Sequence, residues 1–282
     1  MKIAFVVCAY PPYQGGIGNA AARQARALQA LGHDVVVLTP HHGEGARQET
    51  VDGVVVRRLT AIVRHGTSAF VPGLARAVGS FDALYVHYPF YGGAEAAVIA
   101  ARFAKVPYVV FFHMDVEWET GWRSRFVSLY ERTAAPWILR NASRVLVSSR
   151  DYAANSSLAR YGLPNLQERP YGIDTTRFSA GPVDEADIRR LGIDPQRHTL
   201  LFVGGMDRGH AFKGVRELLS AFAAAQLGDR AQIALVGDGE LRPDFEEEAR
   251  RLGIDSGVVF LGRASDADLG LAYRLARATV LP

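Results

Sequence analysis

Cysteine, lysine and long apolar runs are scarce in this chain of 282 residues. Its single cysteine, Cys8, can form neither an intramolecular disulfide nor a cysteine-rich metal site. Only Lys2, Lys105 and Lys213 are lysines among 32 basic residues, so a lysine in a chemically suitable place is informative. No apolar run reaches the roughly 18 residues of a membrane span, and the apolar start is too short for a signal peptide. We therefore expect a cytoplasmic protein.

Strong charge of either sign is also missing. The formal net charge is +3, too small for a protein that binds nucleic acid by neutralising many phosphates. Hydrophobic residues make up 49% and charged residues 22% of the chain, as in an ordinary folded enzyme. The length suits about two domains. These features predict a two-domain enzyme without a nucleic-acid partner.

Short runs of β-branched and aromatic residues alternate with helical patterns, twice along the chain. This alternation predicts an α/β protein with two Rossmann-like parallel sheets, each covered by helices on both faces. The expected strands are 3–8, 35–39, 53–58, 83–87, 108–112 and 144–148, then 199–204, 232–236, 258–261 and 278–281. The expected helices include 19–31, 93–104, 121–139 and 150–160, then 215–227, 242–252 and 266–276.

The two halves are separated by a stretch rich in proline and glycine, with four prolines between residues 161 and 195. We predict an N-terminal domain at 1–165, a linker at 166–195 and a C-terminal domain at 196–282. Ligands of such sheets bind beyond the carboxyl ends of the strands. The candidate site residues are therefore sought at those ends.

A loop with Gly15, Gly16 and Gly18 follows the first predicted strand. Glycines at such a junction let backbone N–H groups and a helix N-terminus approach an anion, although a plain turn is the alternative. Gly16, Gly18 and Ala21 also match the dinucleotide pattern G-x-G-x-x-A. The loop is long, however, and the second strand ends at His41 without the acidic residue that holds the ribose of NAD. A dehydrogenase is therefore disfavoured.

The fifth predicted strand is followed by His113, Asp115 and Glu117. A histidine at the carboxyl end of a parallel strand favours a functional role. Asp115 and Glu117 are candidate site residues, and helix capping is an equally good explanation for both.

In the second half, Arg208 and Lys213 lie between the first strand and its helix. There a pair of cations and the helix N-terminus favour binding of a diphosphate, with solvated surface charges as the alternative. The next strand is followed by Gly237, Asp238 and Gly239, where missing side chains would let a base or ribose lie against the backbone. A tight turn is the other explanation for these glycines.

Taken together, these motifs resemble glycosyltransferase family 4, the retaining enzymes of GT-B architecture. The resemblance covers nearly the whole chain. Its carriers are the Gly15–Gly18 loop, His113, Val147–Ser149, Gly172–Asp174 with Phe178, Phe212–Gly214 and Val236–Gly239.

The resemblance implies an acceptor-binding N-terminal domain, a C-terminal domain that binds a UDP- or GDP-sugar, and transfer in the cleft with retention. It implies no metal and no cofactor. The Gly15–Gly18 loop would approach the diphosphate and the donor sugar, His113 would hydrogen-bond the sugar, and Lys213 would stabilise the leaving diphosphate. The implied acceptor is a polysaccharide, a lipid-linked molecule or another glycan, and Asp115 and Glu117 would be possible acceptor or sugar contacts.

The sequence departs from the family pattern in two places. The family often has arginine after the glycine that ends the first strand of the second domain, where this chain has Gly205. Arg208 is the candidate substitute. The family also continues beyond the position of Pro282 into a segment with two glutamates eight positions apart that contact the donor. We therefore expect a truncated second domain, weak donor binding, and slow turnover or none at all.

Basic and aromatic residues mix within the helix expected at 121–139, as they do in helices at a membrane interface. An amphipathic helix packed on the sheet has the same composition and is the interpretation we favour, with peripheral contact at the inner membrane face as the alternative. Three other functions remain open. They are a sugar-nucleotide epimerase of the same architecture, a glycogen or sucrose synthase-like enzyme, and a non-catalytic sugar- or nucleotide-binding protein.

Overall fold

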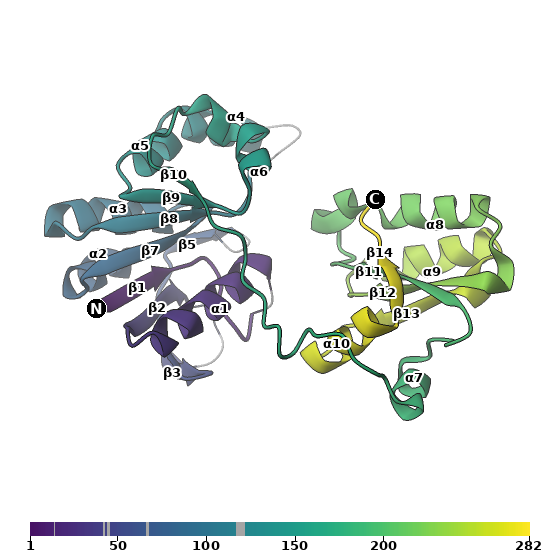
Figure 1. The fold of residues 1–282 in the computed structure, drawn as a ribbon. Helices are drawn as coiled ribbons and strands as arrows, with labels where there is room; N and C mark the ends of the chain where they lie inside the picture. The colour runs from purple at the N-terminus through teal and green to yellow at the C-terminus, as the bar shows by residue number, and fades with distance from the viewer. Residues whose placement is uncertain (14, 42, 44–45, 66–67, 117–121) are drawn as a thin grey trace. The chain divides into compact units, whose positions relative to one another are not determined.

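The computed structural model describes residues 1–13, 15–41, 43, 46–65, 68–116 and 122–282. The chain forms two compact units, Met1–Gly172 and Ile173–Pro282, each built on its own sheet (Figure 1).

The sheet of the first unit contains eight strands in the order β10-β9-β8-β7-β1-β2-β4-β3. All neighbours are parallel except β3 and β4. The strands are β1 (Lys2–Val6), β2 (Asp34–Pro40), β3 (Gln48–Val51), β4 (Val54–Leu59), β7 (Ala83–Tyr88), β8 (Tyr108–Phe112), β9 (Arg144–Val147) and β10 (Leu166–Glu168). A separate hairpin pairs β5 (Val63–His65) with β6 (Ser68–Phe70).

Helices cover both faces of this sheet because alternate strand residues point to opposite sides and are buried on both. Helix α1 (Gly16–Ala30) packs its alanines on Phe5, Val35 and Val37. The opposite face, with Val6, Val86 and Val110, is covered from α2, α3 and α5. The helices are α2 (Gly73–Ala77), α3 (Gly93–Ala104), α4 (Trp122–Arg132), α5 (Ala134–Arg140) and α6 (Arg150–Ala154), with short 3₁₀ turns at Val78–Ser80 and Ser157–Arg160.

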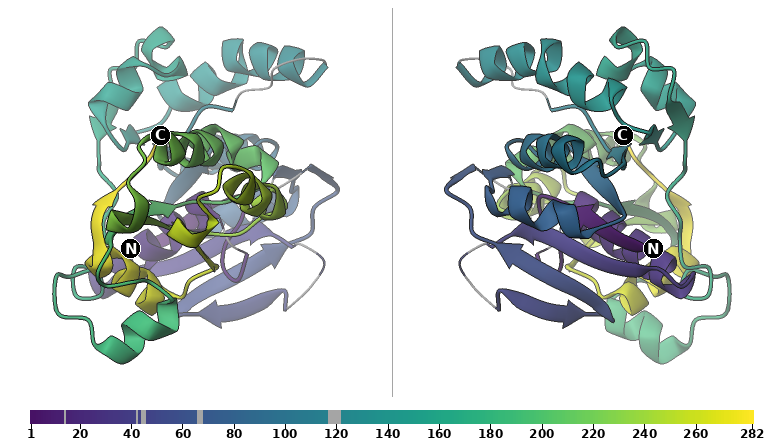
Figure 2. Two further views of the ribbon diagram at one scale, coloured as in Figure 1. Left: turned by 90° about the vertical axis from the view of Figure 1, so that its right-hand side faces the viewer. Right: turned by 90° about the vertical axis from the view of Figure 1, so that its left-hand side faces the viewer.

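The second unit has a parallel sheet of four strands in the order β13-β12-β11-β14. Apolar clusters lie on both of its faces, one with α8 and α9 and the other with α7 and α10. Figure 2 shows this unit from two further sides. Its elements are α7 (Glu185–Leu191), β11 (His198–Val203), α8 (Val215–Ala224), β12 (Ala231–Val236), α9 (Arg242–Arg251), β13 (Val258–Gly262), α10 (Asp266–Leu275) and β14 (Ala276–Thr279), with 3₁₀ turns at Arg208–Lys213, Gly228–Arg230 and Asp255–Gly257. Two parallel-sheet α/β units are thus confirmed.

Two helices expected as single segments are each broken. The helix expected at 121–139 divides into α4 and α5 at Thr133. Pro136 has no N–H group to donate to the carbonyl of Arg132, so a continuous helix would lose that bond. The helix expected at 150–160 ends at Ala154, and the side chain of Ser156 then caps a new 3₁₀ turn by accepting from Leu158 N.

The stretch predicted as a linker, 166–195, contributes to both units. Leu166–Glu168 forms the edge strand β10, and the N–H of Arg169 donates to the carbonyl of Val147 at 2.7 Å. Helix α7 packs Leu191 into the core of the second unit. The domain limits of the sequence analysis stay a prediction.

None of the helices in the described part of the chain is long and apolar enough to cross a membrane. Peripheral membrane contact stays a prediction.

Two loops at the carboxyl edge of the second sheet pack on each other through their backbones. The N–H of Met206, after β11, donates to the carbonyl of Asp238, after β12, at 3.0 Å. A Cβ atom on Gly237 would lie 1.8 Å from the carbonyl oxygen of Gly204. Gly237 also has a φ of +137°, which side chains rarely adopt. The loops can meet only because this residue is glycine.

The Gly237→Ala variant is therefore expected to lose at least about 2 kcal/mol of unfolding free energy, because the overlap and the backbone strain must both be relieved. Gly181→Ala is the matched control in the same unit, since a Cβ atom at that position meets nothing within 4 Å. Urea denaturation followed by circular dichroism measures both. Equal stability of the two variants would contradict the described contact.

Candidate functional site

The glycines of the β1–α1 loop have different structural reasons. A Cβ atom on Gly18 would lie 2.8 Å from the carbonyl oxygen of Ala9, so this glycine lets α1 pack on the loop. Cβ atoms on Gly15 and Gly16 would meet nothing within 4 Å, and neither residue has a left-handed φ. Both are exposed at the start of α1, which has no acidic residue in its first turn and no side-chain cap. Packing explains Gly18 and leaves Gly15 and Gly16 available for a ligand.

The same loop is held from below by a buried arginine. The Nη2 atom of Arg58, on β4, donates to the carbonyl oxygen of Pro11 at 2.6 Å. Its Nε atom donates to Glu49 on the edge strand β3 at 2.7 Å. Arg58 is only 3% exposed, so the carboxylate of Glu49 is needed to balance its charge. The sequence analysis missed this pair because β3, with its polar residues, was not expected as a strand.

The two kinds of glycine in this loop predict opposite results. Gly18→Ala is expected to cost about 1–3 kcal/mol of stability, because the new methyl group overlaps backbone that has little room to move. Gly16→Ala is expected to leave stability within about 0.5 kcal/mol, since alanine is a good helix former in open space. Urea denaturation followed by tryptophan fluorescence reports on this unit, because all three tryptophans lie between residues 118 and 137. Destabilisation by Gly16→Ala of the same size as by Gly18→Ala would refute the distinction.

His113 lies at the carboxyl end of β8 as predicted, inside a chain of hydrogen bonds. Its Nε2 atom lies 2.8 Å from Nδ1 of His87, which is on β7, and its Nδ1 atom lies 2.7 Å from the hydroxyl of Tyr171. The rings stack as well, with centroids 5.1 Å apart for the two histidines and 5.7 Å for His113 and Tyr171. Phe111 supports Tyr171 from one side at 5.2 Å. The sequence analysis found His113 and missed both partners.

Burial keeps the hydrogen-bonded side chains of His87, His113 and Tyr171 uncharged. Loss of solvation lowers the pKa of His113 to about 4, and it lowers the pKa of the fully buried His87 well below its ordinary value, with a further contribution from His113. Burial raises the pKa of Tyr171 to about 12. At neutral pH the three groups are therefore uncharged, and this edge of the sheet suits a hydroxylated ligand better than an anion.

The low pKa of His113 predicts acid sensitivity. In the unfolded chain a histidine binds a proton near pH 6.5, whereas the folded chain does so only near pH 4. The unfolded state thus holds more protons between these values, and stability falls as the pH falls from 6.5 to 4. From 1.36 kcal/mol per pKa unit, His113 contributes at most about 3 kcal/mol to this loss, less what solvent screening removes at its exposed edge.

The measurement is urea denaturation by tryptophan fluorescence across that pH range. His113→Phe should make the dependence shallower, with the part due to the buried His87 remaining. His198→Asn, which removes an exposed histidine of the other unit, should leave it unchanged. Parallel pH curves for the native chain and His113→Phe would contradict the assignment.

Asp115 has structural partners in the first unit. Its carboxylate accepts from the hydroxyl of Ser157 at 2.5 Å and from the Ser157 N–H at 3.1 Å. It thereby ties the chain after β8 to the 3₁₀ turn after α6. A hollow of about 660 Å³ opens beside it, lined also by Ser128, Glu131 and Arg160. A sugar or acceptor contact by Asp115 stays a prediction, and Glu117 lies outside the described residues.

In the second unit, Lys213 reaches back to the carboxyl end of β11. A Cβ atom on Gly204 would lie 3.1 Å from the Lys213 ammonium nitrogen and 2.8 Å from its Cδ. The lysine side chain thus lies over the first residue after the strand, in the space that Gly204 leaves open. Helix α8 begins at Val215, two residues later, and its first turn contains Glu217. Positive charge at this edge therefore comes from the lysine more than from the helix end.

Arg208 extends into solvent, with 86% of its side chain exposed. Its Nε atom is 3.9 Å from Glu240, so little holds it in place. The side chain that lies against Gly205 is instead His210, whose Nδ1 atom would be 2.8 Å from a Cβ there and which is held by Asp207 at 2.7 Å. The sequence analysis did not single out this pair. The phosphate-binding role of Arg208 stays a prediction.

Gly237 and Gly239 lie at the same edge, but the reason expected for them differs from what the structure shows. The space that their side chains would fill is taken by the backbone of Gly204 and Met206, not left open for a base or ribose. Asp238 lies between them and is half exposed, with Arg263 at 3.9 Å. Binding of donor by these three residues stays a prediction that the glycines alone do not support.

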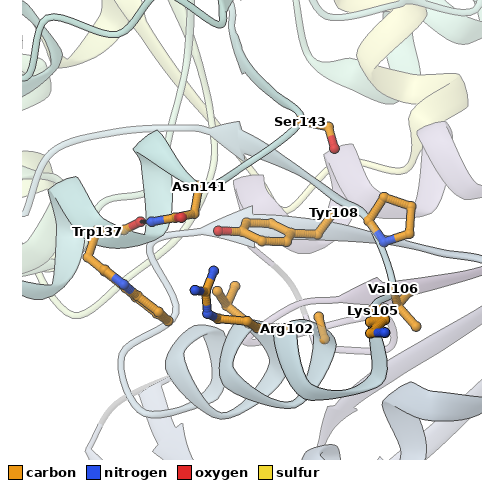
Figure 3. A pocket seen from close by; sticks show the side chains of 10 residues that line it. Arg102, Lys105, Val106, Tyr108, Trp137, Asn141 and Ser143 are labelled. Carbon is orange, nitrogen blue, oxygen red and sulfur yellow. Dashed lines mark hydrogen bonds between the residues drawn. The ribbon is translucent and has the colours of Figure 1, made fainter.

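A second pocket lies at the opposite edge of the first sheet, where β8 begins (Figure 3). Tyr108, the first residue of β8, lies between Trp137 of α5 and the end of α3, which carries Arg102 and Lys105. The volume of this pocket is about 230 Å³. Because His113 follows the last residue of the same strand, this pocket is distinct from the candidate site.

Comparison with known proteins agrees with this arrangement. The profile of the "Glycosyl transferase 4-like domain" matches residues 15–171, and that of "Glycosyl transferases group 1" matches residues 197–282. The chain belongs to the glycosyltransferases. The resemblance noted in the sequence is thus confirmed at the level of the family.

Individual relatives support the same assignment. EpsF of Bacillus subtilis, a protein assigned to the glycosyltransferases, is 33% identical over 193 residues, which are 65% of this chain and 47% of EpsF. The GDP-mannose-dependent alpha-mannosyltransferase of Mycolicibacterium smegmatis is 28% identical over 97% of this chain and 71% of that enzyme. The chain thus matches about half of the first relative and under three quarters of the second.

Solved structures show the same fold at low identity. Sucrose-phosphate synthase from Thermosynechococcus elongatus superimposes with a TM-score of 0.76 at 20% identity, over all of this chain and 75% of that one. HepE from Anabaena, in complex with UDP and glucose, gives a TM-score of 0.72 at 19% identity, over 99% of this chain and 73% of that one. The architecture is therefore GT-B.

Proposed function

We propose that this chain transfers a sugar from a UDP- or GDP-sugar to a glycan, polysaccharide or lipid-linked acceptor, with retention of the anomeric configuration. The observation that carries the proposal is the position of Lys213 over the carboxyl end of β11. When the bond between the sugar and the diphosphate breaks, negative charge grows on the leaving phosphate oxygen. An ammonium fixed at that place stabilises the transition state more than the ground state.

Each unit, taken by itself, carries groups that suit a part of such a donor. Lys213 and the exposed Arg208 supply cations for the diphosphate. Gly15 and Gly16 leave the N-terminus of α1 open to a phosphate or a sugar, and the uncharged hydrogen bonds of His113 end at the half-exposed Tyr171, whose hydroxyl suits the hydroxyl group of a sugar. No metal or cofactor is part of the proposed reaction.

The names of relatives support the donor class. The mannosyltransferase of Mycolicibacterium smegmatis is GDP-mannose-dependent, and HepE was solved with UDP and glucose. We extend this class of donor to the present chain. The choice between UDP and GDP, and the acceptor, are decided by the experiment below.

Calorimetric titration of the 282-residue chain with UDP, GDP, UDP-glucose and GDP-mannose tests the donor site. Lys213→Met is expected to weaken nucleotide-diphosphate binding roughly 10-fold or more, because a hydrogen bond to a charged group contributes about 1.5–3 kcal/mol. Lys105→Met is the matched control, since Lys105 lines the pocket at the opposite edge of the first sheet. Equal affinity of the two variants would exclude Lys213 from the site.

The reaction is tested by release of nucleotide with an acceptor panel, followed by NMR of the product anomer. Retention supports the proposal, and inversion would overturn it in that respect. Conversion of the donor without any acceptor would identify an epimerase instead. Donor binding without any turnover, even in a longer chain, would identify a binding protein.

A further inference from the structure

Both ring nitrogens of His113 are already used within the first unit. One faces Nδ1 of His87 at 2.8 Å and the other faces the hydroxyl of Tyr171 at 2.7 Å. A ligand that approaches this edge therefore finds no free nitrogen on His113. The outermost residue of this hydrogen-bonded series is Tyr171, which is 42% exposed.

The direction of the hydrogen bonds follows from the buried end. His87 is fully buried, and its Nε2 atom has no partner among the described residues. If His113 donated to His87, the neutral His87 would carry its only proton on that unpartnered Nε2. If His87 donates through Nδ1, only a lone pair is left unpaired there. Orphaned buried N–H groups are the rarer and costlier case, so the second direction is favoured.

This direction determines which atoms donate and which accept in the remaining hydrogen bonds of the series. His113 accepts at Nε2, and because it is neutral it carries its proton on Nδ1. That proton is donated to the oxygen of Tyr171. The hydroxyl hydrogen of Tyr171 is then free to point outward, while the ring is held by stacking on Phe111 and His113 at 5.2 and 5.7 Å. Such a fixed, uncharged donor suits the hydroxyl group of a sugar.

We propose that Tyr171 is the residue of this unit that donates a hydrogen bond to the transferred sugar, and that His113 and His87 are positioning residues that orient its hydroxyl. This inference rests on the proposed function. It reassigns the sugar contact from His113 to a tyrosine of the stretch that the sequence analysis treated as a linker.

The binding test compares Tyr171→Phe with Tyr273→Phe, a tyrosine of similar exposure, 41%, in the second unit. Tyr171→Phe keeps the stacked ring and removes the donor. The Kd for UDP-glucose or GDP-mannose is expected to rise roughly 2- to 12-fold, the equivalent of one net hydrogen bond, whereas the Kd for free UDP or GDP stays unchanged. Tyr273→Phe should change neither. Unchanged affinity of Tyr171→Phe for both sugar nucleotides would overturn the proposal.

A second test needs no donor. NMR of the ¹⁵N-histidine-labelled chain distinguishes the two neutral tautomers, and the signals of His113 are assigned by their loss in His113→Phe. We expect the proton on Nδ1 in the native chain and a shift toward Nε2 in His87→Phe, which removes the donor. A proton on Nε2 in the native chain would overturn the direction argued above.

The two tests separate failure of this inference from failure of the proposed function. If the native chain binds no nucleotide or sugar nucleotide, the proposed function fails and the sugar contact fails with it. If the native chain binds sugar nucleotides and only Tyr171→Phe is without effect, the proposed function stands and the contact returns to another residue.

Discussion

Parallel pairing is the constraint on which the rest of this structure depends. Apart from β3, every strand of the two main sheets runs in one direction. Parallel neighbours cannot be joined by a tight turn, so each strand is followed by a crossover that begins at the same edge. Gly18 and His113 are far apart in sequence, yet both follow strands that end there. The same constraint brings Lys213 and Asp238 to one edge of the second sheet.

The two edges are built from different materials. At the first, aromatic rings and two neutral histidines stack on one another, and burial removes their charge. At the second edge, two loops contact each other through their backbones at glycines, and the side chain of Lys213 lies over Gly204. Taken separately, the first edge suits an uncharged, hydroxylated ligand, and the second suits an anionic one.

The sequence predicts most of this fold because the signals are local. The strands of the two sheets are rich in valine, leucine and aromatic residues, and helix α3 begins and ends where its pattern predicts. The missed elements are short or polar, such as Gln48–Val51, whose pairing depends on a partner strand. The break at Thr133 was available from Pro136, since proline cannot donate within a helix.

The site is harder to predict because its partners come from distant parts of the chain. His113 stands out at the end of an apolar strand. His87, by contrast, is a residue within a strand, and nothing local shows that its ring meets His113. Tyr171 lies in a stretch without helix or strand, where sequence patterns carry little information. Their roles follow only from the register of β7 with β8 and from the path of the chain after β10.

Glycines show most clearly why a motif needs a structure. From the sequence alone, Gly15, Gly18 and Gly237 give the same prediction, that another group approaches the backbone closely. In the structure, protein backbone lies close to Gly18 and Gly237, whereas a Cβ atom on Gly15 would meet nothing within 4 Å. Where another part of the protein occupies the space of the missing side chain, packing alone explains why the residue is glycine. The residues that favour a ligand are therefore Gly15 and Gly16, which folding does not need, and Lys213, which forms no ion pair within the described part of the chain.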